Sequence, residues 1–464
     1  MIHLTACQTR VRALSVLFSL VALLALATRI RAQSLPEPDR DSLLNGLTIL
    51  FSPRPGDPNV LVKMRIKSGA AFDLAGKGGT MALLGDALFP DPTTREYVAD
   101  QLGGKLDVAT NYDSIDITIS GKAGELERIV ELLRSALVTP QLSPENIARV
   151  RDARLKLLSE KPLPAAEIAD QAVAARLFGS FPYGHPASGT AETVRKVDRA
   201  DLLLARERFL NADNATVAVI GGVERGRLMR TLRQLLGPWV KSDRSIPPTF
   251  RQPDPPNARV LIVNQAGATM AEIRLAVKGL ARSDNDAAAA LALAQIVRYR
   301  WELASPDAKI FARHEAHALP GMLVLGASVP AASAAQAVAN AQQVLRSLAQ
   351  NPPSAAELER ARNEVFMNVS QQISDADFLA QLWLDIETFK DSSRYGQTSG
   401  LRIISLPDLQ RVANRLFKDV PVATVVVGNY EQLKTSFGKN AELRGEKLDA
   451  KTTSDSILPA KKPD

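Results

Sequence analysis

The feature that most constrains this chain is an internal repeat, because segments of its first half recur in its second half. Residues 133–155, LRSALVTPQLSPENIARVRDARL, resemble residues 345–366, LRSLAQNPPSAAELERARNEVF. Residues 194–224 resemble residues 401–431 at a similar offset. Two matched pairs in the same order indicate a duplicated unit. The sequence therefore predicts two tandem homologous domains.

A proline-rich stretch separates the two copies. Residues 247–256 are PPTFRQPDPP, and proline at this density neither continues a helix nor fits a central strand. We therefore expect an N-terminal domain over 40–240, a linker over 241–257 and a C-terminal domain over 258–437. Residues 438–464 are polar and charged without periodicity, which predicts a disordered tail.

Both helical and strand patterns occur within each copy, which predicts an α+β fold. In residues 59–69, alternation places Val60, Val62, Met64 and Ile66 on one face of a strand. Further strands are expected at 44–51, 114–121, 214–222 and 272–281. Helices are expected at 77–88, 94–102, 123–137, 143–160 and 165–178.

The first 32 residues differ from the rest of the chain. Arg10 and Arg12 precede the apolar run ALSVLFSLVALLALA, which is shorter than the ~20 residues of a membrane span. A basic start, a short apolar run and small residues predict a secretory signal peptide over 1–32. We therefore expect a periplasmic or secreted protein, anchored in the membrane if this segment is not cleaved.

Removal of this segment would change the chemistry open to the chain. The only cysteine, Cys7, lies within it, so the remaining chain forms no disulfide and carries out no thiol catalysis. The segment also holds four arginines and no acidic residue, so the remaining net charge is +3 rather than +7. Without a clustered basic and aromatic surface, we expect no nucleic-acid partner.

Several motifs occur in an order that is typical of one peptidase family. They are LNGLTILF (44–51), KSGAAFD (67–73), a glycine-rich entry to a helix ending in ALF, FPYGHPASGTAETV (181–194) and FLNADNATVAVIGGV (209–223). As a set they resemble the insulinase and mitochondrial processing peptidase family (pitrilysin-type zinc peptidases) over about residues 40–435. The resemblance implies two domains, each a mainly antiparallel sheet packed with helices, arranged like a clamshell.

The zinc site of that family needs His-x-x-Glu-His on one helix and a Glu from a later helix. When the resemblance is followed residue by residue, the first His falls at Ala82, the Glu at Gly85 and the second His at Asp86. The distal Glu falls at Lys156 or Leu157. Because the ligand set is missing, the chain resembles the family's non-catalytic subunits. We expect no zinc cofactor and no catalysis by the chain on its own.

Two further pairs of residues are weaker candidates for a site. His314 and His317 in RHEAH are three residues apart, but their segment predicts strand or loop, in which they would point to opposite faces. They are weak metal candidates. In the family's non-catalytic subunits, an arginine and a tyrosine of the C-terminal domain help to hold the substrate. Arg298 or Arg300 takes the arginine's place, whereas the tyrosine has no counterpart.

The leading hypothesis is an exported, non-catalytic homologue that pairs with a zinc-bearing homologous subunit, or with a second copy, to enclose a peptide substrate. One alternative is a standalone peptide- or protein-binding or assembly module without proteolysis. A further alternative is a diverged active metallopeptidase that uses the HEAH segment. None of these hypotheses includes a stable membrane span once the signal peptide is cleaved.

Overall fold

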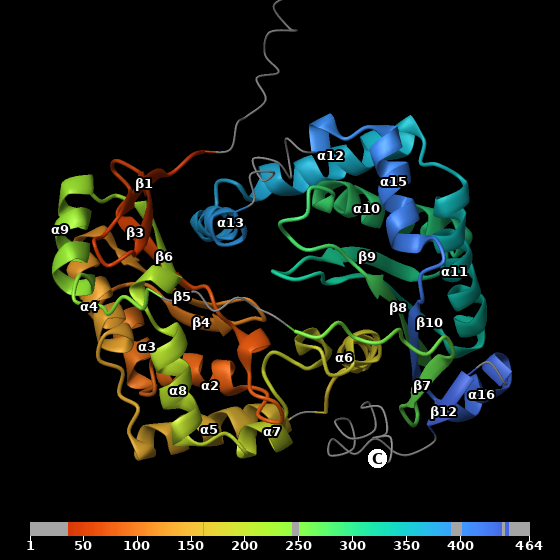
Figure 1. Ribbon diagram of the computed structural model, residues 1–464, viewed down its shortest axis with the longest axis horizontal. Coiled ribbons are helices and arrows are strands. Elements are labelled where there is room, and N and C mark those ends of the chain that lie inside the picture. The colour runs from red at the N-terminus through yellow and green to blue at the C-terminus, as the bar shows by residue number, and fades with distance from the viewer. Residues whose placement is uncertain (1–35, 161, 244–249, 391–400, 439–440, 445–464) are drawn as a thin grey trace, which may run out of the picture. The chain divides into compact units, whose positions relative to one another are not determined.

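Two six-stranded sheets, one in each half of the chain, organise the computed structural model (Figure 1). The structure describes residues 36–160, 162–243, 250–390, 401–438 and 441–444. The predicted signal peptide, the middle of the predicted linker and most of the predicted tail lie outside the described residues. Among the described helices, none is long and apolar enough to cross a membrane.

The first sheet has the strand order β1-β2-β6-β3-β5-β4. Only β2 and β6 run parallel, and the other neighbours are antiparallel. The strands are β1 (Asp39–Ser42), β2 (Thr48–Pro53), β3 (Asn59–Ile66), β4 (Leu106–Thr110), β5 (Ile115–Lys122) and β6 (Ala215–Gly221).

The second sheet repeats this topology in the order β12-β7-β11-β8-β10-β9. Its parallel pair β7 and β11 corresponds to β2 and β6, and antiparallel strands follow in the same sequence. The copies differ at one edge, where β12 runs parallel to β7 but β1 runs antiparallel to β2. The strands are β7 (Val260–Asn264), β8 (Met270–Lys278), β9 (Lys309–Glu315), β10 (Met322–Pro330), β11 (Ala423–Gly428) and β12 (Ala441–Arg444). The predicted fold class, α+β with two homologous domains, is confirmed.

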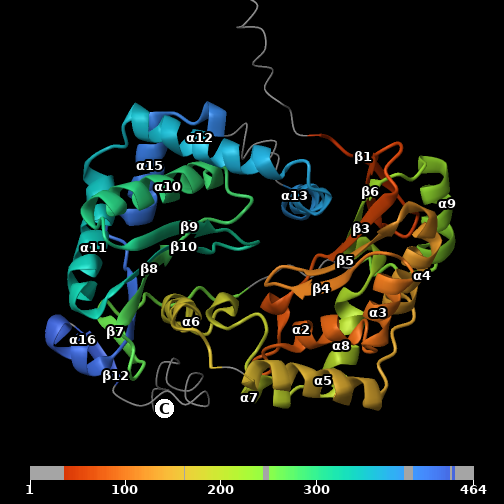
Figure 2. The same ribbon diagram turned by 180° about the vertical axis from the view of Figure 1, so that it is seen from behind.

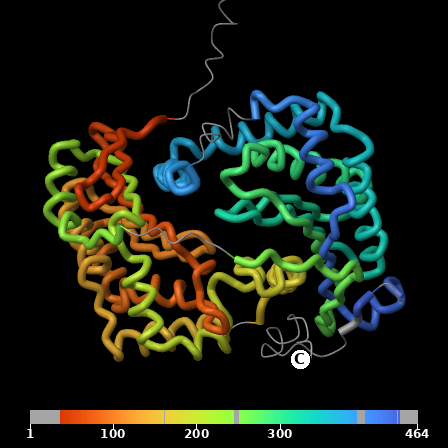
Figure 3. The backbone as a smooth tube through the Cα atoms, in the orientation of Figure 1, coloured from red at the N-terminus to blue at the C-terminus, as the bar shows by residue number. Residues whose placement is uncertain are grey.

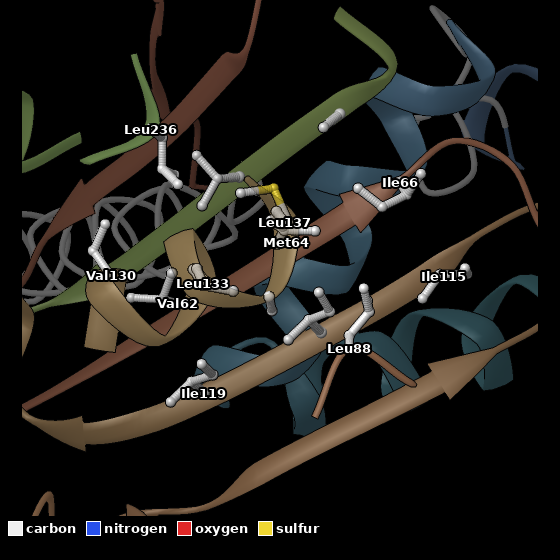
Figure 4. Close-up of a cluster of buried hydrophobic side chains, with 14 of the residues drawn as sticks. Val62, Met64, Ile66, Leu88, Ile115, Ile119, Val130, Leu133, Leu137 and Leu236 are labelled. Carbon is white, nitrogen blue, oxygen red and sulfur yellow. The ribbon is translucent and has the colours of Figure 1, made fainter. Parts of the chain in front are cut away.

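Helices of each half cover one face of that half's own sheet. The first set is α2 (Thr80–Ala87), α3 (Thr93–Asp100), α4 (Leu126–Leu137), α5 (Pro144–Ser159), α7 (Ala191–Arg195), α8 (Arg199–Phe209) and α9 (Arg225–Leu236). The second set is α10 (Ala287–Ala304), α11 (Ala334–Gln350), α12 (Ala355–Gln372), α15 (Leu406–Phe417) and α16 (Tyr430–Phe437). The predicted core face of β3, with Val62, Met64 and Ile66, is buried against the first set (Figure 4).

Two helices are exchanged between the halves. Helix α6 (Ala165–Phe178) belongs to the first half of the sequence, yet it packs on β8 and β11 of the second sheet. Helix α13 (Ala376–Phe389) lies between α12 and α15 of the second half in the sequence, yet it packs on β3 and β6 of the first sheet. The two ribbon views and the backbone tube show α6 beside the second sheet (Figures 1, 2 and 3). The remaining face of each sheet is therefore covered by the other half of the chain.

One predicted boundary needs correction. The tail was expected to be disordered from residue 438, but residues 441–444 form β12 and pair with β7. Alternating apolar residues are few in so short a segment, so its own sequence does not reveal the strand; the open edge of β7 supplies the hydrogen-bonding partners. The described parts of the predicted linker, 241–243 and 250–257, contain neither helix nor strand.

Candidate functional site

Helix α2 contains Ala82, Gly85 and Asp86, the positions to which the resemblance assigns the zinc motif. The helix follows Gly79, whose φ of 91° is in the left-handed region. Asp73 accepts hydrogen bonds from the N–H groups of Gly79 (2.6 Å) and Met81 (2.7 Å), which satisfies two donors at the start of the helix. Burial raises the pKa of Asp73 to about 7, although both hydrogen bonds act in the opposite direction.

Two of the three motif positions, Ala82 and Gly85, serve packing in this chain. Ala82 is buried and presents only a methyl group. Gly85 faces β4 so closely that an added Cβ would lie 2.8 Å from Oγ1 of Thr110. A side chain at residue 85 would therefore have to displace Thr110. Asp86 is the only one of the three that carries a metal-ligand atom.

The carboxylate of Asp86 is held by Arg154 of α5. Nε of Arg154 lies 2.6 Å from Oδ2 of Asp86, and Nη2 lies 2.9 Å from Oδ1. The guanidinium also donates to the carbonyl oxygens of Ala82 (3.3 Å) and Ser188 (3.4 Å). A fixed cation therefore links α2, α5 and the loop that contains Ser188.

These residues do not fit a zinc ion. A structural or catalytic zinc site takes three or four donors of the His, Cys, Asp or Glu type. The only such donor on this face of α2, Asp86, is already paired with a guanidinium that would repel a second cation. In the part of the chain that the structure describes, no group of three or more His, Cys, Asp or Glu residues is arranged to hold a metal.

The structure corrects the expected position of the distal residue on α5. The sequence placed Lys156 or Leu157 opposite the motif, but Leu157 is 71% exposed and Lys156 pairs with Glu160 in solvent. The residue of α5 that contacts α2 is Arg154. A helix turns by about 100° per residue, so Lys156, two residues after Arg154, lies on nearly the opposite side of α5.

A second polar cluster, which sequence reasoning missed, joins the two halves. Asp113, in the turn between β4 and β5, contacts Nδ1 of His317 (3.1 Å) and accepts from the N–H of Ala318 (3.1 Å). Tyr183 donates to Asp113 (3.3 Å), and its oxygen accepts from the N–H of Leu319 (3.1 Å). Burial, reinforced by the charge of Asp113, raises the pKa of Tyr183 and keeps the phenol protonated. Nothing in the local sequence distinguishes Asp113 from other turn residues.

The two predicted metal candidates are engaged separately. Nε2 of His314 accepts a hydrogen bond from the N–H of Leu280 at 2.9 Å, and burial lowers the pKa of His314 to about 4. His317 instead faces Asp113 and packs edge-on to Tyr112, with ring centroids 5.2 Å apart. The two rings therefore bond to different groups, His314 to a main-chain N–H and His317 to a carboxylate.

The predicted substrate residues Arg298 and Arg300 lie on α10 and bind carboxylates of α12. Nη2 of Arg298 lies 2.7 Å from both carboxylate oxygens of Glu364. Nε of Arg300 lies 2.7 Å from Glu357. The contacts that the structure shows fasten α10 to α12, so substrate binding by these arginines stays a prediction.

A pocket of about 150 Å³ lies beside the cluster around Asp113. Tyr112 contributes to its wall and donates a 2.6 Å hydrogen bond to the carbonyl of His185, which also lines it. The other lining residues come from α6, the loop at 184–186, β9 and the start of β10: Asp170, Gln171, Ala174, Gly184, Pro186, Arg313, Glu315 and Met322. The pocket is thus formed by both halves of the chain.

Comparison with known proteins agrees with this architecture. Residues 196–365 match the family model described as the peptidase M16 inactive domain. Subunit 1 of the mitochondrial cytochrome b-c1 complex of Homo sapiens is 26% identical over 222 residues, covering 46% of this chain and 46% of that protein. Part of the chain is therefore similar to the M16 peptidase inactive domain. The resemblance predicted from its motifs is confirmed.

Solved structures of other proteins share the fold. The peptidase M16 inactive domain of Pseudomonas fluorescens has a TM-score of 0.75 and 17% identity, covering 85% of this chain and 98% of that one. A protease of Helicobacter pylori has a TM-score of 0.74 and 19% identity, covering 85% of this chain and all of that one. At this level of identity the likeness concerns the fold alone. The chain spans about half the length of the curated relatives it matches.

Proposed function

We propose that this chain is an exported, non-catalytic M16 homologue that acts as the partner subunit of a zinc-bearing peptidase and helps to enclose its peptide substrate. The observation that carries the proposal is the pair formed by Arg154 and Asp86. A guanidinium lies against the motif helix, where catalysis would require a metal and its water. The scaffold is kept while the hydrolytic chemistry is absent.

The similarity to a subunit of a larger complex supports a role in assembly. The human relative is by name a component of the cytochrome b-c1 complex. A domain that has lost its own metal can still supply a wall of a chamber and an interface. We therefore favour a zinc-bearing homologue as the partner over a second copy of this chain.

An extended peptide has a suitable place to bind next to α2. Strand β4 ends the first sheet and contacts α2. In the described part of the chain, β4 pairs on one side only, with β5. A peptide that adds to such an edge gains main-chain hydrogen bonds with little dependence on sequence. The peptide would then lie along the motif helix, within reach of a partner's zinc.

Export is the further element of this proposal. It is supported by Arg10, Arg12 and the apolar run that follows them. We expect the chain in the periplasmic fraction of its host, shortened by a segment that ends near residue 32. Mass spectrometry of the N-terminal peptide from that fraction tests this; an intact N-terminus in the cytoplasmic fraction would contradict export.

Affinity purification of the tagged full chain from its native host tests the partnership. We expect a homologue with an intact His-x-x-Glu-His motif to co-purify, with zinc and peptidase activity present in the complex and absent from the recombinant chain. Recovery of the chain alone would contradict the partnership and favour the standalone binding module. Stoichiometric zinc in the recombinant chain, with chelator-sensitive hydrolysis, would contradict the non-catalytic assignment.

A further inference from the structure

The pocket beside Asp113 has a shape and a charge that restrict what it can bind. Its apolar walls are formed by Ala174, Pro186, Met322 and the ring of Tyr112. Its volume of about 150 Å³ is similar to that of cavities that accept a benzene ring. It therefore fits an aromatic ring or a short aliphatic chain.

Charged groups of α6 and β9 lie among the lining residues. Two carboxylates, Asp170 and Glu315, accompany one guanidinium, Arg313, so the lining has a net charge of −1. Behind them, Arg274 bonds Asp170 at 2.6 Å and Glu272 at 3.1 Å, and the charges of Arg274 and Glu272 cancel. The net negative charge therefore remains when the neighbouring ion pairs are included.

The ion pairs leave acceptor atoms available. Oδ1 of Asp170 accepts a hydrogen bond from Nε of Arg274. The same oxygen lies 3.4 Å from Nη2 of Arg313. Oε1 of Glu315 accepts a hydrogen bond from Nε of Arg313. Within the described residues, Oδ2 of Asp170 and Oε2 of Glu315 receive no hydrogen bond. The side chains of Asp170 and Glu315 are 33% and 27% exposed, so a ligand can reach them.

An anion would be a poor ligand here. The only cation in the lining, Arg313, is already paired with both carboxylates, and an incoming anion would face those carboxylates as well. A cation would gain the attraction of the net negative charge and donate to the available oxygens. An uncharged apolar ligand would fill the walls but leave those oxygens without a partner.

We propose that this pocket binds a primary ammonium group carried on a short apolar stem, with the stem against Ala174 and Met322 and the ammonium at Glu315. The ligand is either a small free amine or a lysine side chain of a polypeptide, because both present the same chemistry. The site is separate from the motif on α2, so it stands or falls independently of the proposed partnership.

Calorimetric titration of the full chain near pH 7 tests the proposal. Benzylamine and benzyl alcohol probe a small ligand, because they have similar shape and differ in charge. Nα-acetyl-lysine methylamide and Nα-acetyl-norleucine methylamide probe a side chain of a polypeptide. They too have similar shape and differ in charge. We expect each ammonium probe to bind at least fivefold more tightly than its uncharged counterpart. The tighter of the two ammonium probes then identifies the source.

Two variants locate the binding. Glu315→Gln removes the charge and keeps the shape of the side chain. It should lower the affinity for benzylamine about tenfold, as expected for loss of a charged hydrogen bond. Ala174→Leu fills the pocket and should lower the affinity for both benzylamine and benzyl alcohol. The control Glu302→Gln removes a carboxylate that pairs with Arg298 on α10, away from the pocket, and should change neither affinity. Circular dichroism melting verifies that each variant is folded.

Three results would overturn the proposal: equal binding of charged and uncharged probes, unchanged benzylamine affinity in a folded Ala174→Leu variant, or no binding of either ammonium probe. None of these results bears on co-purification of a zinc-bearing partner.

Discussion

At the scale of single residues, Arg154 fastens α5 to α2 and to the loop that contains Ser188. A zinc ion joins two helices by accepting lone pairs from both, whereas the guanidinium joins them by donating to a carboxylate and two carbonyl oxygens. The side chain of Arg154 is 12% exposed and that of Asp86 is 31% exposed. The pair is thus partly shielded from water, and losing one member leaves the other poorly solvated.

We expect Arg154→Ala to lower the free energy of unfolding by about 2 kcal/mol, because it leaves the carboxylate of Asp86 without its partner. Urea denaturation measures the change, and the double variant with Asp86→Ala should recover part of it. Lys156→Ala, which removes an exposed ion pair on the same helix, should cost about 0.5 kcal/mol or less. Equal effects of the two single substitutions would contradict the assignment of Arg154 as the inward residue.

Asp73 should make stability depend on pH. Its ordinary pKa is 3.8, and burial raises it to about 7 in the folded chain. Between these values the folded state holds a proton that the unfolded state has lost, so stability falls as pH rises from about 4 to 7. Asp73→Asn should reduce this fall by roughly 2 kcal/mol between pH 5 and 7, measured by urea denaturation.

A matched control for Asp73 is Asp91, which is bonded to Thr93 at the start of α3. Those hydrogen bonds lower the pKa of Asp91, so its titration lies below pH 5. Asp91→Asn should therefore leave the slope between pH 5 and 7 unchanged. An unchanged slope in Asp73→Asn as well would show that Asp73 is ionised throughout this range.

At the scale of elements, periodicity was a good guide to where helices and strands lie and a poor guide to where they pack. The range predicted for α6, 165–178, is the range observed. Its partner was not predictable, because α6 buries small apolar residues such as Ala169, Ala172 and Ala175 around much of its circumference. Such a helix must be enclosed, but its pattern does not say by which sheet.

The same limit applies to β3 and to the candidate site. Alternation placed Val62 and Met64 in the core, but it could not show that Arg65 on the other face would meet Asp385 of α13, 2.6 Å away and 320 positions later. The site positions on α2 followed from motif order. Arg154 did not, because the residue of α5 that faces α2 is set by how the two helices pack.

Helix α13 should control the stability of the first sheet. Trp383 and Leu384 pack on Leu61 and Ile220, and Trp383 is 2% exposed. Trp383→Ala should lower the free energy of unfolding by about 3 kcal/mol or more. It should also speed hydrogen exchange of the β6 amides, which lie under α13. Mass-spectrometric exchange measures this. The amides of β11, under α6, serve as the internal control; equal acceleration in β6 and β11 would argue against a local effect of α13.

At the scale of the whole molecule, the exchange of α6 and α13 makes the two repeats interdependent. Arg274 of β8 bonds Asp170 of α6 at 2.6 Å, as Arg65 of β3 bonds Asp385 of α13. Each half thus contributes to the other a helix with an apolar face and a carboxylate that neutralises a buried arginine. A tandem repeat in sequence is therefore not a pair of independent folding units in this chain.

Separated halves should therefore fold poorly alone and associate when mixed. A fragment covering 38–243 lacks α13, so Leu50, Leu61 and Ile220 become exposed and Arg65 keeps only Asp116 as a carboxylate partner. A fragment covering 250–444 lacks α6, so Val425 and Val427 of β11 become exposed. We expect each fragment alone to bind a hydrophobic dye and to unfold without a sharp transition, because the newly exposed apolar area opposes folding. An equimolar mixture should regain near-ultraviolet circular dichroism and a cooperative melt. Cooperative unfolding of either fragment alone, with no gain on mixing, would show that the exchanged helices are dispensable.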